Sequence, residues 1–357
     1  MLSLLIAMWF AAASDIQASE DSVQTIRKSV SESTPAKQLI RTAPEYPWSE
    51  LNRGREAWVH VTYCVDESGD VQNVSILDST GSKRFETAAI DTVKSWEFEP
   101  ATKNGKPAWQ SRNEVYIRFA ISNEELGASP KFVRQFRKLN KLLENQELEK
   151  ADELFWKVYH SSELSLYELG KLWSQRVRYE GMVGDYYRLN LALMMATASN
   201  GEWIEEQDYV RLLNLRVRVE LQLGKYREAM RSFRKLEQAT NPESEAVIKL
   251  QPTMDKLKAM IDSESVLAIQ AEVRPRGDCT FCNDSWDFTP VRNDFQILNI
   301  TGTLNSIDMR CDNKRFESKV SDNVAYKIAD DWGKCHVQIY GEPGTTFEVL
   351  MLPASES

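Results

Sequence analysis

Histidine is scarce in this sequence: the 357 residues include only His60, His160 and His336. Because imidazole is a common general base and metal ligand, this scarcity argues against a histidine-based catalytic or metal site. A nucleophile elbow, a phosphate-binding loop, a dinucleotide fingerprint and a paired metal motif are also missing. We therefore predict a binding protein rather than an enzyme, with no cofactor, no metal and no small-molecule substrate.

Runs of basic residues are missing as well, and the net charge is -9. This balance argues against a nucleic-acid partner. The apolar fraction of 42% and the ten tryptophans are sufficient for buried cores. A chain of this length should hold two or three domains.

The N-terminus lacks an apolar run of the roughly 20 residues that span a bilayer. Residues 4–13 are apolar and end in small residues, but Asp15 follows and no lysine or arginine precedes them. We expect residues 1–18 to be a cleaved signal peptide or a truncated membrane anchor, with a segment of the mature chain as a further alternative. Residues 19–37 are serine-rich with mixed charge, which predicts a flexible linker.

Residues 38–123 show a clear order of patterns. Residues 58–65, 71–77 and 114–121 alternate as strands do, and residues 66–69 form a turn between the first two. Residues 85–96 carry an apolar stripe at helical spacing. The order predicts strand, turn, strand, helix and strand, with the helix on one face of a small antiparallel sheet. The buried faces should contain Val59, Val61, Tyr63 and Val65, then Val115, Ile117, Phe119 and Ile121.

This segment resembles the C-terminal domain of TonB-type energy transducers over less than a quarter of the chain. The matching residues are Tyr46, Pro47, Gly54, Val65, Asp66, Gly69, Val71, Phe85, Ala88, Ala89, Trp96, Phe98, Pro100, Ala101, Asn104, Gly105 and Pro107. The resemblance implies a periplasmic domain that binds the plug region of outer-membrane receptors, whose N-terminal box pairs with a sheet edge. It also implies energy from an inner-membrane, proton-driven complex.

The sequence departs from that family's pattern at its N-terminal side. A standard transducer has a membrane-spanning helix and a long proline-rich spacer. By contrast, residues 19–42 contain a single proline, Pro35. At about 3.3–3.6 Å per residue, such a linker cannot cross a periplasm. The resemblance therefore supports the binding module more strongly than force transmission.

The candidate binding site is the edge strand at residues 112–119. An incoming strand would pair with its backbone, while Arg112, Glu114, Tyr116 and Arg118 project from the face away from the helix. The alternative is a solvated edge whose charges discourage pairing.

Residues 130–263 are rich in leucine and charged residues, which favours helix. Expected breaks are Gly170, Gly181, Gly184, Asn200-Gly201, Gly224 and Asn241-Pro242. The corners at Gly184 and Gly224 resemble each other, and the second is similar to the inner part of a tetratricopeptide unit. We predict a degenerate helical-repeat domain of about three hairpins, which serves either as a spacer or as a concave peptide-binding surface.

Residues 265–353 return to short alternating runs with turns between them, which predicts a small β-sandwich. Expected strands are residues 266–273, 294–300, 303–310, 315–320, 324–328, 336–340 and 346–352. The fold class is therefore α+β and multi-domain.

Four of the five cysteines lie in this last section: Cys279, Cys282, Cys311 and Cys335. An exported chain meets an oxidising compartment, so two disulfides are expected, with Cys311–Cys335 and Cys279–Cys282 the favoured pairing among three. Zinc is an alternative because Cys279 and Cys282 have knuckle spacing, but a second knuckle is missing. Cys64 is left as a packed free thiol, or as a partner in an intermolecular disulfide.

Three functions compete on this basis. The leading one is a periplasmic TonB-like protein that binds an outer-membrane receptor or other envelope partner by strand addition, in energy-coupled transport across the outer membrane. The second is a periplasmic structural adaptor whose helical repeats hold a protein partner without energy transduction. The third and weakest is a thiol-disulfide enzyme, because residues 283–285 suggest a turn after Cys282 rather than a helix.

Overall fold

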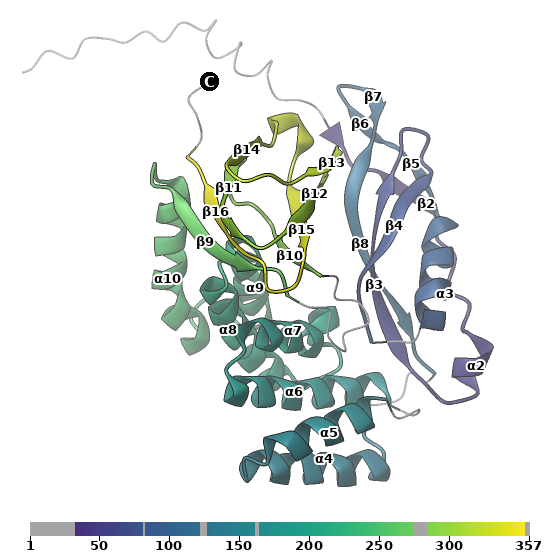
Figure 1. Cartoon of the computed structure of the whole chain (residues 1–357). Coiled ribbons are helices and arrows are strands. Elements are labelled where there is room, and N and C mark those ends of the chain that lie inside the picture. The colour runs from purple at the N-terminus through teal and green to yellow at the C-terminus, as the bar shows by residue number, and fades with distance from the viewer. Residues whose placement is uncertain (1–32, 81–82, 122–126, 161–163, 275–283, 354–357) are drawn as a thin grey trace, which may run out of the picture.

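The computed structural model describes residues 33–80, 83–121, 127–160, 164–274 and 284–353. They form an N-terminal part (residues 33–121), a helical part (residues 127–263) and a C-terminal part (residues 264–353), which pack against one another (Figure 1). The class is mixed α and β, as the sequence predicts. Within the described ranges, no helix is both long enough and apolar enough to cross a membrane.

The N-terminal part is built on an antiparallel sheet with strand order β4-β3-β8. Its strands are β3 (Ala57–Val65), β4 (Val71–Ser79) and β8 (Gln110–Phe119), and helix α3 (Lys83–Lys94) covers one face. In Figure 1, α3 lies on the face turned away from the rest of the chain. The core between them contains Ala57, Val59, Val61, Tyr63, Val65, Phe85, Ala89, Val93, Trp96, Phe98, Ile117 and Phe119. Strand parity and the helical stripe therefore predict this core well, but Ile121 lies past the end of β8 and is exposed.

Short strands extend this part beyond the predicted pattern. They are β1 (Ser33–Thr34), β2 (Lys37–Ile40), β5 (Glu97–Glu99), β6 (Ala101–Lys103) and β7 (Lys106–Ala108), with a one-turn helix α2 (Trp48–Leu51). β2 pairs with β5, and β1 pairs with β6. The last residues of the segment that we predict as a linker thus pair with the N-terminal part, while residues 1–32 lie outside the described residues.

Helices fill the middle of the chain. They are α4 (Pro130–Glu144), α5 (Leu148–Tyr159), α6 (Leu166–Val183), α7 (Tyr186–Ala196), α8 (Glu206–Gln222), α9 (Tyr226–Ala239) and α10 (Glu245–Asp262). Successive helices pack against each other and share one buried cluster. Serine or aspartate caps begin several of them, with a complete capping box at Ser165 and Glu168. The resemblance to a tetratricopeptide repeat stays a prediction.

Two glycines that we predict as helix breaks lie inside α6 instead. Gly170 is buried there, and a Cβ on it would come within 2.8 Å of Ile204 and 2.9 Å of the Trp203 carbonyl. Gly170 therefore allows a close approach between α6 and the segment before α8. Gly184 does end the helix, with a φ of 86° that an L side chain rarely adopts. The error arises because helix propensity takes no account of tertiary packing.

The C-terminal part contains two antiparallel four-stranded sheets. One has the order β14-β11-β16-β9 and the other β10-β15-β12-β13. The strands are β9 (Leu267–Glu272), β10 (Ser285–Phe288), β11 (Asp294–Thr301), β12 (Leu304–Cys311), β13 (Arg315–Lys319), β14 (Val324–Lys327), β15 (Cys335–Gly341) and β16 (Thr346–Met351). Both sheets contribute to one buried cluster. The sequence predicts every strand in this set except β10, and the finer description as a β-sandwich remains a prediction.

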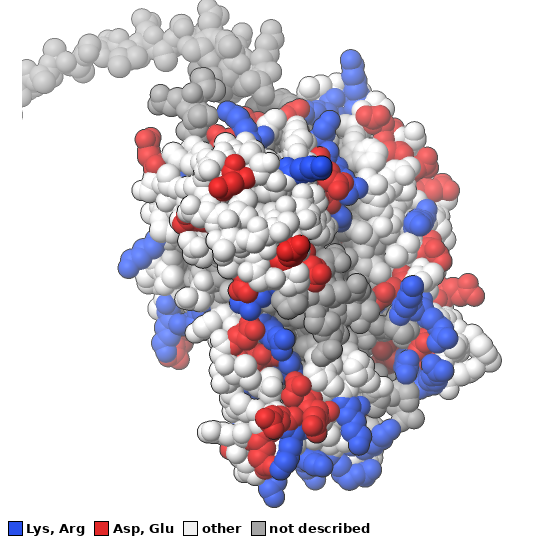
Figure 2. Space-filling view, viewed as in Figure 1, with Lys and Arg blue, Asp and Glu red and all other residues white. Residues whose placement is uncertain are grey.

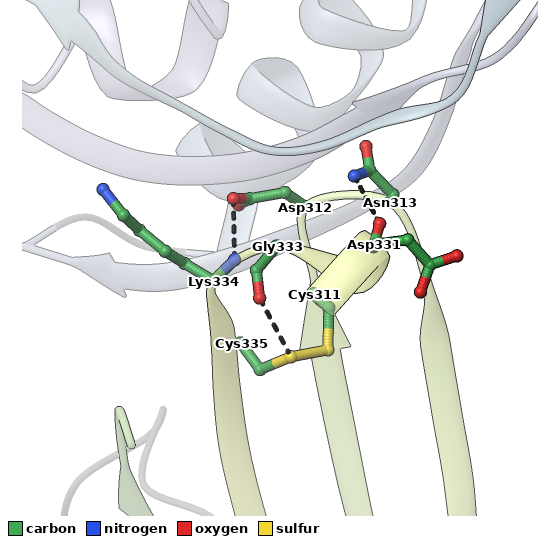
Figure 3. Close-up of a disulfide and its surroundings, with 7 residues drawn as sticks. All are labelled: Cys311, Asp312, Asn313, Asp331, Gly333, Lys334 and Cys335. Atoms are coloured by element: carbon green, nitrogen blue, oxygen red, sulfur yellow. Dashed lines mark hydrogen bonds between the residues drawn. A yellow bond between two sulfur atoms is a disulfide. The ribbon is translucent and has the colours of Figure 1, made fainter. Parts of the chain in front are cut away.

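A disulfide joins Cys311 at the end of β12 to Cys335 at the start of β15, which is the pairing favoured from the sequence (Figure 3). Around it, the Asp312 carboxylate accepts a 2.8 Å hydrogen bond from the Lys334 N–H. Asn313 donates a 2.8 Å hydrogen bond to the Asp331 carbonyl. The disulfide and these two hydrogen bonds together hold the turn between β12 and β13 against the segment before β15. Cys279 and Cys282 lie outside the described residues.

An ion pair between a buried lysine and a half-buried aspartate joins the helical part to the C-terminal part. Lys225, which precedes α9, places its Nζ 2.9 Å from the Asp287 carboxylate on β10. Burial disfavours both charges, but the neighbouring lysine outweighs burial and lowers the pKa of Asp287. The charges of Asp287 and Glu228 likewise outweigh burial and raise the pKa of Lys225. The pair should therefore remain ionised at neutral pH.

Asp287→Asn tests this pair through its pH dependence. A carboxyl whose folded pKa is lowered stabilises the fold above its ordinary pKa, and this contribution is lost as pH falls through the folded pKa. The variant should be about 1–2 kcal/mol less stable than the parent at pH 7. This gap should shrink below about pH 4, where aspartate protonates. Urea titrations between pH 7 and pH 3 measure it, and a gap that does not change with pH would contradict the assignment.

Candidate partner-binding edge

Strand β8 ends its sheet: among the described strands it pairs only with β3. The register sets Tyr116 opposite His60, Glu114 opposite Thr62 and Arg118 opposite Trp58. These side chains therefore lie on the face away from α3, as the alternation predicts. The backbone of Arg112 also belongs to β8, but its side chain lies outside the part that the structure describes.

An aromatic stack occupies this second face. The rings of His60 and Tyr116 are parallel, with centroids 4.1 Å apart. Glu114 adds its carboxylate at 3.4 Å from His60 Nε2. Tyr116 is half-buried and packs against the helical core, so it is part of a contact within the chain.

Trp58 continues the stack toward the helices. Its ring lies 5.5 Å from Tyr116 and 5.8 Å from Trp203, and it is only 1% exposed. Although Trp58 lies in β3, it belongs to the buried cluster of the helical part. The helical part therefore covers the second face of the sheet over this stretch.

Polar contacts also join the N-terminal part to the helical part at the C-terminal end of β8. Arg118 forms a 2.5 Å ion pair with Glu202. The Glu56 carboxylate accepts hydrogen bonds from the backbone N–H groups of Ile121 and Leu166, at 2.8 and 3.0 Å. Since Leu166 is the first residue of α6, Glu56 ties a helix N-terminus to the end of the strand.

The N-terminal end of β8 contacts the C-terminal part of the chain. Ser111 donates its backbone N–H to the carbonyl of Asp312, in the turn after β12. Figure 3 shows this turn, at Asp312 and Asn313, next to the N-terminal part. The chain itself thus engages the first part of the edge, and only the stretch beyond it stays a candidate for pairing.

Two residues that match the family pattern, Tyr46 and Gly69, contact the core and a turn of the N-terminal part. Tyr46 packs edge-on against Phe85 and Phe119. Burial, together with the charges of Glu56 and Glu50, raises the pKa of its hydroxyl to about 12. At Gly69 a Cβ would lie 1.9 Å from the Phe98 carbonyl oxygen, so only glycine fits this turn.

Comparison with known proteins identifies the same segment. Residues 42–121 match the family model described as Gram-negative bacterial TonB protein C-terminal. These residues form a TonB C-terminal domain. The similarity predicted from the sequence is confirmed for this segment, which is less than half of the chain.

The similar proteins cover the same limited stretch. Protein TonB of Yersinia enterocolitica is 41% identical over 20% of this chain and 28% of its own length. Protein TonB of Xanthomonas campestris pv. campestris is 33% identical over 22% of this chain and 35% of its own length. This chain therefore spans about a third of the curated relatives that it matches.

Among solved structures, the solution structure of the Pseudomonas aeruginosa TonB C-terminal domain is 25% identical. The aligned region covers 26% of this chain and 92% of the chain in that structure, with a TM-score of 0.23. The assignment of the segment rests on the family model and the sequence matches.

Sequence reasoning missed Trp58, Trp203 and Asp312 as the residues that cover the candidate site. One signal was available: Trp58 is a large aromatic at a position that alternation assigns to the outer face. An apolar ring there indicates that another layer covers it. Asp312 gives no such signal, because its backbone carbonyl makes the contact.

Proposed function

We propose that this protein binds a partner in the bacterial envelope by strand addition at β8, within energy-coupled transport across the outer membrane. The observation that carries the proposal is the terminal position of β8 in a TonB C-terminal domain. A guest strand would pair with the backbone of the edge, and alternate side chains would set its preference. The partner would be an outer-membrane receptor, the protein would lie in the periplasm, and an inner-membrane proton-driven complex would supply energy.

The usable edge is shorter than the strand. Because Ser111 already donates to Asp312, a guest would pair from about residue 113 to residue 119, or displace that contact. Glu114 and Arg118 are exposed and carry opposite charges, so they would favour a guest with complementary charges at alternate positions. Figure 2 shows that cationic and anionic side chains are interspersed over the visible face of the molecule, so neither sign forms a continuous surface there.

Tyr116→Pro tests strand addition against Tyr116→Ala. Both variants remove the ring that packs on His60, but only proline removes a backbone N–H and fixes φ. Proline should weaken the binding of a receptor-box peptide about tenfold more than alanine does, corresponding to about 1.4 kcal/mol. Fluorescence titration of a labelled peptide against the full chain gives both affinities.

Equal affinities for the two variants would show that the peptide does not pair with β8. Circular dichroism of both variants is the control for folding. Lys319→Ala, on an exposed position of β13, should leave peptide affinity unchanged.

A structural adaptor is the second candidate, favoured by the packing of Trp58 and Tyr116 on the helical part. In this case the helices would hold the partner by a repeat-like surface. Photo-crosslinking side chains placed at Glu114 and at the exposed Ile248 of α10 separate the two. Adducts in the envelope at position 114 support strand addition, and adducts at position 248 alone support the adaptor.

A further inference from the structure

A cavity of about 490 Å³ lies between the N-terminal sheet and the turn that joins β12 to β13. This volume is in the range of small-molecule sites, about 300–1,000 Å³. One wall includes Thr62, Ser75 and Ser111, and the other includes Arg310, Lys314 and Arg315. The two walls come from segments more than 190 residues apart, so the cavity exists only because the two parts pack together.

Positive charge dominates the lining. All charged residues that line the cavity among the described residues are cations. Arg310 and Arg315 share one buried carboxylate, that of Asp308, at 3.0 and 3.1 Å. Arg315 also lies 3.6 Å from the exposed Glu317, whereas no carboxylate of the described residues lies within ion-pair distance of Lys314. Cations thus outnumber carboxylates by three to two among the lining residues and their ion-pair partners.

The polar lining contains hydrogen-bond donors. Ser75 Oγ accepts a 3.1 Å hydrogen bond from Arg310 Nη1, and Ser111 Oγ accepts one of 2.9 Å from Trp109 Nε1. A serine hydroxyl has one proton to donate as well as two lone pairs. Each oxygen accepts one hydrogen bond from the protein, and its proton remains able to donate to a ligand. Hydroxyl protons, guanidinium groups and an ammonium together suit a ligand that only accepts hydrogen bonds.

We propose that this cavity binds a small molecule with a carboxylate or phosphate group. Lys314 would contact the anionic group as a mobile point charge, while Arg315 would offer a planar pair of donors. Such a ligand would touch both walls and would join the TonB C-terminal domain to the C-terminal part. This site lies on the sheet face beside the start of β8, so it is independent of strand addition at residues 113–119.

Isothermal titration of the full chain at low salt tests the site, with inorganic phosphate, succinate and glycerol as probes. At least one of the two anions should bind saturably at one site per chain, and added NaCl should weaken this binding. Glycerol should not bind. Binding of phosphate alone assigns a phosphate ligand, and binding of succinate alone assigns a carboxylate. If neither anion binds, the proposal is wrong.

Lys314→Gln and Lys319→Gln form a matched pair for locating the anion. Lys314 lines the cavity, whereas Lys319 lies further along β13 and is exposed. Lys314→Gln should weaken anion binding about tenfold, because it removes a charge-assisted hydrogen bond to the anion. Lys319→Gln should not change it. Equal effects of the two variants would indicate general surface attraction and overturn the site.

Cys64 provides a second readout, since this half-buried free thiol lines the same cavity. A saturating anion should slow the reaction of Cys64 with N-ethylmaleimide, followed by mass spectrometry of the peptide that contains it. A labelling rate that stays constant while the anion binds would place the anion elsewhere and contradict the proposal.

Discussion

Trp58→Ala should lower the free energy of unfolding by about 3–5 kcal/mol, as expected for truncation of a fully buried tryptophan. The ring is 1% exposed and lies between Tyr116 of the sheet and Trp203 of the helical part. Its removal would leave a cavity at the junction of two parts rather than inside one of them. We therefore expect the helical part to separate from the sheet face at lower urea than the parent protein requires.

Trp48→Ala is the matched control, because Trp48 is 73% exposed on α2 and the same truncation there removes little packing. It should change stability by no more than about 0.5 kcal/mol. Circular dichroism in urea reports the difference, and hydrogen exchange at residues 113–119 reports opening of the sheet. Similar stability losses in the two variants would contradict the proposed role of Trp58.

The consequence for binding follows from the same contact. If the helical part restricts access to β8, Trp58→Ala should strengthen peptide binding even though it lowers the stability of the fold. If the helices instead support the edge strand, the variant should bind more weakly. The peptide titration described for Tyr116 distinguishes the two outcomes on the same protein.

Local patterns predict the N-terminal part well because its elements depend on short-range periodicity. Val59, Val61 and Val65 alternate with polar residues, and Phe85, Ala89 and Val93 repeat at helical spacing, so the common core follows from parity alone. Strand β10 fails this test. Only four residues long, it follows Asn283 and Asp284, whose turn propensity hides the alternation of Trp286 and Phe288.

The candidate site is harder to predict than the fold, because its surroundings depend on contacts between distant segments. Position 116 could be placed in an edge strand from sequence, and Trp58 on the same face indicates a covering layer, but local patterns do not identify the segment that forms this layer. Ser111 meets Asp312 through backbone atoms, which every residue has. The cavity lined by Lys314 has the same origin, because its walls are formed by two separate parts of the chain.

Arg292→Met should lower the free energy of unfolding by about 4 kcal/mol. Arg292 is 9% exposed and donates to five backbone carbonyls, those of Met260, Ile261, Ser263, Ser265 and Met351. The first three lie at the end of α10, where the last carbonyls of a helix have no intrahelical donor. Methionine would fill much of the space but would remove this donor from all five carbonyls. The Met260 carbonyl would keep its 2.8 Å hydrogen bond from the Ser263 hydroxyl, whereas each carbonyl left unpaired and dry would cost about 1–3 kcal/mol.

The geometry of the guanidinium predicts the outcome of a conservative change. Arg292→Lys keeps the charge near the negative end of α10 but has a single nitrogen, so it cannot reach carbonyls on both sides of the junction. It should recover less than half of the loss in the free energy of unfolding.

Arg274→Met is the matched control, because Arg274 is 41% exposed and paired with Glu272. It should lower the free energy of unfolding by less than about 1 kcal/mol. In Arg292→Met, hydrogen exchange should rise first at residues 263–272, where α10 passes into β9. If exchange there remains at the level of the parent protein, Arg292 does not hold the helical part to the C-terminal sheets.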